Sequence, residues 1–320
     1  FYTSFGTIYD YIQENIFDGK HIENDIINIG FWPGGDRDGN PFVTPEITLK
    51  VAARLHDTII KNYHRDIRGL RRKLTFSGVE HRIIELETQL YNIITHQKSS
   101  LTLDSFTQEL KEIKQLIIDQ HQSLYINQIN SLLNKVHLFG FHFANLDIRQ
   151  DSRKHAQFFN TLVTALIESG STIFPENYFD LVENEQIEIL SKVQGKVDLS
   201  IIKDKQTLEA LHTMKAIKTI QTTNGQAAAN RYIISNNQST LHVMQLFAML
   251  KIVAFQEALT VDIGPLFETI TDLENAPRVM EELYTNPSYA AHLKTRANKQ
   301  TIMLGFSDGT KDGGYLMANW

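Results

Sequence analysis

The chain has 320 residues, of which 42% are hydrophobic and 21% charged, with a net charge of -6 at pH 7 and no cysteine. The absence of cysteine excludes disulfides and thiolate metal sites, and the modest charge gives no reason to expect nucleic acid or an anionic membrane as partner. No apolar run approaches the roughly 18 residues of a membrane-spanning helix, and the first residues do not form a signal peptide. We therefore expect a cytoplasmic protein that does not associate with membranes.

The first part of the chain is predicted to be mostly helical after one short strand. That strand is "INIGFW", residues 27–32, and it runs into the glycine-rich stretch "FWPGGDRDGNP". Thr44, Pro45 and Glu46 predict a helix start, because they supply a capping hydroxyl, a proline for the first helical position and an acid for the first turn. The spacing of apolar residues predicts three more helices, at about 79–95, 105–120 and 123–138.

Beyond residue 139 the pattern changes to short β-branched or aromatic runs separated by helical stretches. These runs predict strands near 143–148, 231–235, 263–267 and 301–306. Alternating strands and helices are typical of β/α units with a parallel sheet, and charged residues at the strand ends are typical of eight-stranded (β/α) barrels. We expect a helix-rich α/β fold, a partial barrel of about five parallel strands that forms a single domain over 1–320 with a helical insertion at about 44–138.

Charged residues gather where the predicted strands end. They include Asp36, Arg37, Asp38, Asp147, Arg149, Glu268, Asp308 and Lys311. If these ends meet on one rim, carboxylates without cysteine favour Mg²⁺ or Mn²⁺, and Glu268 and Asp308 are the natural pair of ligands. Arginine and lysine facing such an ion commonly hold a phosphate or carboxylate. The residues thus predict a metal-assisted enzyme that acts on a small phosphorylated or carboxylated anion.

Each of these residues also has a purely structural interpretation. Arg149 would pair with Asp147 or Asp151, and Glu268 would cap the helix that follows it. Asp308 and Lys311 lie three residues apart and would form a local ion pair within a helical turn. Four histidines are expected on amphipathic faces or at the surface rather than on a metal: His137, His142, His155 and His242.

Four longer stretches resemble motifs of the phosphoenolpyruvate carboxylase family. In chain order they are "FWPGGDRDGNPFVTPEIT", "NLDIRQDSRKHA", "GPLFETITDLENAPRVMEELYTN" and "MLGFSDGTKDGGYLMANW". The resemblance implies a cytoplasmic lyase on a helix-rich barrel, dependent on Mg²⁺ or Mn²⁺ and usually a homotetramer. It implies that the complete enzyme makes oxaloacetate and phosphate from phosphoenolpyruvate and bicarbonate.

The same resemblance implies roles for individual residues. Glu268 and Asp308 would hold the metal, which would bind substrate and stabilise the enolate oxygen. Arg149 would bind the phosphate, and Lys311 would line the site beside bicarbonate. In the glycine-rich loop, glycines would allow close backbone approach, and three charged residues would join the network around the substrate: Asp36, Arg37 and Asp38.

The chain also departs from the family's pattern. Its "SDGTKDGG" replaces the common "SDSAKDAG" but keeps the charged residues, and Gln238 stands where members commonly carry lysine, so we assign it no role. Motifs of the type "TAHPTE" and "HGRGGSIGRGG" are absent from the sequence. We therefore expect a central fragment that is inactive by itself. An incomplete barrel exposes sheet edges and apolar faces, which we expect to be covered by helices, by self-association or by disorder near the ends. Two alternatives remain open: another metal-dependent enolate-forming barrel enzyme, and a non-catalytic helical scaffold.

Overall fold

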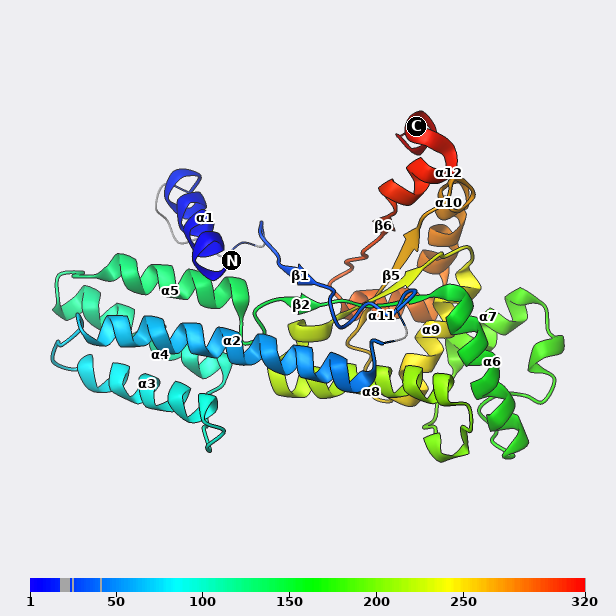
Figure 1. Ribbon diagram of the computed structural model, residues 1–320, viewed down its shortest axis with the longest axis horizontal. Coiled ribbons are helices and arrows are strands. Elements are labelled where there is room, and N and C mark those ends of the chain that lie inside the picture. The colour runs from blue at the N-terminus through cyan, green and yellow to red at the C-terminus, as the bar shows by residue number, and fades with distance from the viewer. Residues whose placement is uncertain (18–23, 25, 41, 320) are drawn as a thin grey trace. The chain divides into compact units, whose positions relative to one another are not determined.

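The computed structural model describes residues 1–17, 24, 26–40 and 42–319 (Figure 1). The chain divides into two compact units, which we treat separately. The helical unit comprises Phe1–Gly30 and Ala52–Asn145, and the sheet unit comprises Phe31–Val51 and Leu146–Trp320. Among the described residues, no helix combines the length and apolar composition needed to cross a bilayer.

The helical unit is built from amphipathic helices around one apolar core. Its helices are α1 (Tyr2–Asn15), the Ala52–Arg71 part of α2 (Pro45–Arg71), α3 (Glu80–Ile94), α4 (Leu103–Gln120) and α5 (Ile126–Phe139). The apolar stripes of the last three meet in the core, as in Leu86, Phe106 and Val136. The three helices predicted between residues 79 and 138 are confirmed within a few residues at each end.

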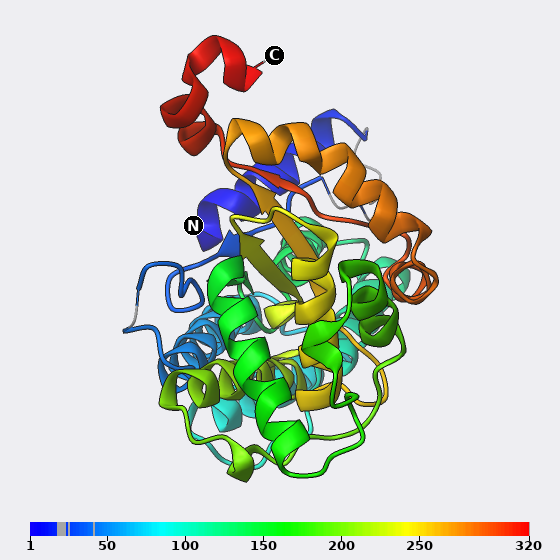
Figure 2. The ribbon, with the colours of Figure 1, turned by 90° about the vertical axis from the view of Figure 1, so that its right-hand side faces the viewer.

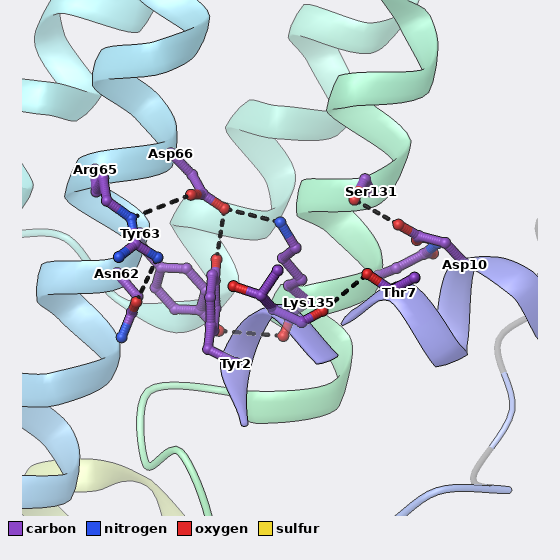
Figure 3. A network of polar contacts seen from close by, with 11 residues as sticks. Tyr2, Thr7, Asp10, Asn62, Tyr63, Arg65, Asp66, Ser131 and Lys135 are labelled. Atoms are coloured by element: carbon purple, nitrogen blue, oxygen red, sulfur yellow. Dashed lines mark hydrogen bonds and ion pairs between the residues drawn. The ribbon is translucent and has the colours of Figure 1, made fainter. Parts of the chain in front are cut away.

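Partly buried polar contacts fix α1 onto the rest of the helical unit. Figure 3 shows Asp66 of α2 between Tyr2 of α1 and Lys135 of α5, with the Tyr2 hydroxyl at 2.8 Å and the Lys135 ammonium at 3.0 Å. Farther along α1, Asp10 accepts a hydrogen bond from Ser131 of α5 at 2.6 Å. Asp66 joins three helices and Asp10 joins two through charged or hydroxyl donors, so α1 is held by directional contacts as well as by apolar packing.

The sheet unit contains four parallel strands that lie side by side in chain order: β3 (Ile148–Asp151), β4 (Arg231–Ser235), β5 (Asp262–Phe267) and β6 (Met303–Leu304). Figure 2 shows β4 and β5 next to each other, in yellow and gold. Ile233, Ile234 and Phe267 are completely buried. Such continuous apolar strands are typical of a parallel sheet that is covered on both faces.

One predicted strand is split in two. Residues 143–148 were expected to form a single strand, but β2 (Asn145–Leu146) pairs with β1 (Gly30–Phe31), whereas β3 pairs with β4. An isolated parallel bridge between Asp36 and Arg149 continues the first pairing toward the main sheet. Strands therefore occur at all five predicted places, and the helix-rich α/β class with parallel pairing is confirmed. The expectation that all five lie in one sheet is wrong, because the two halves of the second strand have different partners.

Helices follow the strands of the sheet unit, as the alternation predicted. They are α6 (Ser152–Glu168), α7 (Glu183–Lys192), α8 (Lys205–Asn224), α9 (Thr240–Val253), α10 (Ile270–Thr285), α11 (Pro287–Thr295) and α12 (Phe306–Asn319), with short 3₁₀ turns at Tyr178–Asp180, Leu199–Ile201 and Gln226–Ala229. Side-chain caps begin several of them, including Asp151 at α6 and Thr269 at α10. The start of α2 at Pro45 also agrees with prediction, and α2 to α5 occupy the region predicted as a helical insertion.

Candidate functional site

The glycine-rich loop lies directly against Asp147 and the start of β3. The Arg149 N–H donates to the Gly35 carbonyl and the Arg37 N–H donates to the Arg149 carbonyl, both at 3.0 Å. A Cβ on Gly35 would stand 2.1 Å from the carbonyl oxygen of Asp147, so only glycine fits there. The close backbone approach that we expected of the loop's glycines is thus observed at Gly35.

Two charged side chains of the loop, Asp36 and Arg37, have different partners. Asp36 lies 3.9 Å from the Arg149 guanidinium, and its Oδ1 accepts the Asp38 N–H. Arg37 donates to the carbonyl of Glu209 and to the hydroxyl of Thr213, both on α8. The structure therefore brings Asp36 to Arg149 and anchors Arg37 to a helix.

Arg149 does not have the partners expected from the simple structural interpretation. Asp147 pairs instead with Arg231 at 2.9 Å, and Asp151 pairs with Arg153 at 2.5 Å. Burial raises the pKa of Asp147, while the neighbouring Arg231 opposes that rise. Arg149 contacts Asp36, and its buried Nε has no hydrogen-bond partner among the described residues. A guanidinium with a spare donor is suited to bind an anion.

Glu268 follows the last residue of β5 and does not cap the next helix. The cap of α10 is Thr269, whose hydroxyl accepts the Asp272 N–H while Asp272 accepts the Thr269 N–H. Glu268 instead accepts the N–H of Asn236, which follows β4, at 2.6 Å. The cap interpretation of Glu268 is therefore wrong, because the neighbouring threonine supplies the hydroxyl that the helix needs.

Glu268 also lies against the start of α12, which carries Asp308. The Gly305 N–H donates to Phe267 at 2.8 Å, and a Cβ on Gly305 would stand 3.0 Å from the Glu268 Cγ. Burial raises the pKa of Glu268, and the nearby carboxylates of Asp38, Asp308 and Asp272 raise it further. Mutual repulsion of this kind is expected where carboxylates surround a position that a cation would fill.

Lys311 forms the local ion pair that its spacing predicted. Its ammonium lies 3.3 Å from Asp308 in the first turns of α12, and both side chains are exposed. Asp312 accepts the Ile270 N–H and so joins α12 to the start of α10. The described residues contain no group of three or more acids or histidines with the geometry of a metal site. A site built on Glu268 and Asp308 would therefore use two protein carboxylates, which is the usual number for Mg²⁺.

The comparisons with known proteins agree with the motifs. The sequence model of phosphoenolpyruvate carboxylase matches residues 5–102 and 85–320, which together cover nearly the whole chain. The chain belongs to the phosphoenolpyruvate carboxylase family. The resemblance seen in the four motifs is thereby confirmed, and with it membership of a family of carboxy-lyases that use a divalent metal.

Individual phosphoenolpyruvate carboxylases match over a limited part of their length. The chain is 33% identical to the enzyme of Nitrosomonas eutropha, over 92% of this chain and 36% of that protein. It is 31% identical to the enzyme of Nitrosomonas europaea with the same coverage, and 27% identical to that of Prochlorococcus marinus subsp. pastoris, over 98% of this chain and 38% of that protein. The chain spans little more than a third of the length of these relatives.

The sequence reasoning missed several residues beside the candidate site. Asn236 binds Glu268 through its backbone, and Arg153 lies on the first turn of α6, where it is clamped by Asp151. Charge interactions link Arg153 to Asp38 and Glu268 as well, and all three acids raise its pKa. The Asp151–Arg153 pair could have been found from its spacing, since an acidic cap is often close to a basic residue in the first turn. The Asn236 contact depends on the positions of two separate strands.

Proposed function

We propose that this chain carries part of the active site of a phosphoenolpyruvate carboxylase, whose complete form makes oxaloacetate and phosphate from phosphoenolpyruvate and bicarbonate. The main observation in support of this proposal is that Glu268 lies beside the start of α12, the helix that contains Asp308. Family membership supports the same activity. The proposal includes the closure of the sheet into an eight-stranded (β/α) barrel, which would keep these strand ends on one rim.

Glu268 and Asp308 would hold one Mg²⁺ or Mn²⁺. Oxygen donors without cysteine fit these hard ions, and the repulsion that raises the pKa of Glu268 would be relieved by a cation. When bound, the ion would supply Lewis-acid stabilisation for the oxygen of the pyruvate enolate. The Asn236 N–H would fix the Glu268 carboxylate, since one of its oxygens is already engaged at 2.6 Å.

Cationic side chains would bind the anionic parts of the substrates. Arg149, with its free Nε and its contact to Asp36, would bind the phosphate of phosphoenolpyruvate. Lys311 would line the site beside bicarbonate, where its ammonium also balances the charge of Asp308. Asp36, Arg37 and Asp38 would complete the network around the substrate by holding the loop to Arg149 and to α8. We further propose a cytoplasmic homotetramer for the complete protein and self-association of the 320-residue chain.

The metal assignment can be tested on the 320-residue chain itself. Mn²⁺ binding is measured by the loss of the free-ion signal in electron paramagnetic resonance. Glu268→Gln and Asp308→Asn should each weaken binding by at least about tenfold, since each removes one of two charged ligands. The control is Glu274→Gln, which changes an exposed glutamate on α10 of the same unit. This variant should bind Mn²⁺ as tightly as the unaltered chain does. Unchanged Mn²⁺ binding in both site variants would reject the assignment.

Catalysis is tested on the complete protein. Oxaloacetate formation from phosphoenolpyruvate and bicarbonate is followed by coupled reduction in variants that carry Glu268→Gln, Arg149→Met or Glu274→Gln. Loss of turnover in Glu268→Gln and Arg149→Met, with Glu274→Gln fully active, is the expected result. Turnover that does not require bicarbonate would point to a different enolate-forming reaction.

A further inference from the structure

The carboxylate of Glu268 is held by a backbone bend that directly follows β4. Its Oε2 accepts the Asn236 N–H at 2.6 Å. Asn236 has a φ of 50°, in the left-handed region that residues with a Cβ seldom occupy, although asparagine enters it more readily than most. A residue in this region keeps its conformation only when neighbouring groups fix it. The contact with Glu268 therefore depends on what holds Asn236.

Two hydrogen bonds fix the peptide group between Asn236 and Asn237. On one side, the Ser152 hydroxyl donates to the Asn236 carbonyl at 2.6 Å. On the other side, the Asn237 N–H donates to the carbonyl of Leu266 in β5 at 3.1 Å. Because a peptide group is planar, holding both its C=O and its N–H fixes the orientation of the whole group. The bend after β4 is thus anchored to the start of α6 and to β5.

The register of the sheet explains why Ser152 contacts Asn236. Strands β3 and β4 are parallel, and Asp151 is the partner of Ser235 in the pairing. Ser152 and Asn236 are the next residues along the two chains, so they meet where the strands end. Ser152 is completely buried as the first residue of α6, the helix that Asp151 caps. Its hydroxyl is shielded from water, which would otherwise compete for the Asn236 carbonyl.

We propose that Ser152 is a positioning residue of the metal site, which holds Asn236 so that the Asn236 N–H fixes the Glu268 carboxylate. The inference rests on the proposed function, because that proposal makes Glu268 a metal ligand. Groups that orient a metal ligand from behind commonly contribute about 10- to 100-fold to metal affinity. Ser152 acts through the backbone of Asn236 and has no role in contacting the metal or the substrate.

The first measurement uses the 320-residue chain without metal, so that it does not depend on the metal assignment. Hydrogen exchange of the Asn236 amide is followed by NMR on protein that contains isotope-labelled asparagine. Ser152→Ala should make this exchange about tenfold faster, as expected when one supporting hydrogen bond is lost. The control is Ser191→Ala on α7, which removes another buried hydroxyl that donates to a backbone carbonyl, that of Ile187 at 2.7 Å. This variant should leave the exchange of Asn236 unchanged.

The second measurement is the affinity for Mn²⁺, again from the free-ion signal in electron paramagnetic resonance. Ser152→Ala should weaken Mn²⁺ binding about tenfold, whereas Ser191→Ala should bind as the unaltered chain does. In the complete protein, Ser152→Ala should raise the Mn²⁺ concentration needed for half-maximal turnover about tenfold and change turnover at saturating Mn²⁺ less than about twofold. A general loss of stability would not produce this difference, and urea unfolding of both variants checks for such a loss.

Unchanged exchange of Asn236 in Ser152→Ala would overturn the proposal, and so would an equal acceleration in Ser191→Ala. Faster exchange with unchanged Mn²⁺ binding would also overturn it if Glu268→Gln loses Mn²⁺, because Glu268 would then be a ligand that needs no support from Ser152. Unchanged Mn²⁺ binding in Glu268→Gln would reject the metal assignment and with it the role of Ser152 at a metal. Exchange measured without metal distinguishes that failure from a failure of Ser152 to hold Asn236.

Discussion

Replacing Gly35 with alanine tests whether the close approach of the glycine-rich loop is required by the fold. The added Cβ would stand 2.1 Å from the Asp147 carbonyl oxygen, whereas real Cβ contacts are essentially never shorter than 3.0 Å. The loop would have to move away by about 1 Å, and the obstacle is backbone, which cannot rotate aside as a side chain can. Gly35 is therefore expected to be the least replaceable residue of the loop.

The size of the effect follows from the contacts that the movement breaks. Two backbone hydrogen bonds, from Arg149 to Gly35 and from Arg37 to Arg149, join the loop to the start of β3 at 3.0 Å each. Losing both costs about 2 kcal/mol, and overpacking adds about 1 to 3 kcal/mol, so Gly35→Ala should destabilise the sheet unit by about 3 to 5 kcal/mol. Mn²⁺ binding should weaken as well, because Asp38, which interacts with Glu268, would move with the loop.

Gly39→Ala is the matched control. Gly39 lies in the same loop with a φ of 65°, and nothing lies within 4 Å of the Cβ position. Its replacement should cost only the strain of alanine in the left-handed region, about 1 to 2 kcal/mol. Urea unfolding is followed through tryptophan fluorescence, since Trp32 accepts the Gly35 N–H and reports on this loop. A Gly35→Ala chain that unfolds at the same urea concentration as Gly39→Ala would refute the reasoning.

Three further outcomes are expected from the structure. Arg231→Met should lower the free energy of unfolding by about 3 kcal/mol, because it leaves the half-buried Asp147 unpaired. This decrease should be smaller in a chain that also carries Asp147→Asn. Thr269→Ala should cost about 1 kcal/mol by circular dichroism melting and should weaken Mn²⁺ binding slightly, because it loosens the residue next to Glu268. Burial, reinforced by Arg37, lowers the pKa of His155 to about 3, although Asp151 opposes the shift and His242 adds to it. Below a pH of about 6.5 this histidine is therefore protonated in the unfolded chain but stays neutral in the folded chain, so the free energy of unfolding should fall by about 1.4 kcal/mol per pH unit. His155→Phe should reduce this dependence on pH, as measured by urea unfolding at several pH values.

Local features of the fold were predictable from the sequence. Thr44, Pro45 and Glu46 are contiguous, and α2 begins at Pro45, where the Thr44 hydroxyl accepts the Ile47 N–H at 3.4 Å. The strand positions followed from short apolar runs, which need only neighbouring residues to be seen. The split between β2 and β3 was not predictable, because it depends on which distant strand each half meets.

The candidate site was predictable in its residue types but not in its contacts. Arg149 had nearby acids on both sides in sequence, yet its contact is Asp36, more than a hundred residues away. Arg37 reaches Thr213, which lies 176 residues further along the chain. At α10 the cap is a local one, because Thr269 and Asp272 form a capping box three residues apart that can be recognised in the sequence. The contacts of Arg149 and Arg37 are long-range choices among partners that a local pattern leaves equal.

The alternating charges of the glycine-rich loop are explained by the different elements that surround it. Asp36 faces Arg149 of β3, Arg37 is bound by acceptors on α8, and Asp38 lies within range of Arg153 and Glu268. A turn selected only for its bend would leave these three side chains in solvent, where their signs would not matter. Here Asp36 and Asp38 each have a cation within range, Arg149 and Arg153, and Arg37 donates to acceptors on α8. Gly35 lets the backbone come close enough for the contacts of Asp36 and Arg37 to form. The loop therefore acts as a junction between the sheet, α8 and the candidate site, so a change of sign at any one of its charged residues should disturb the other two.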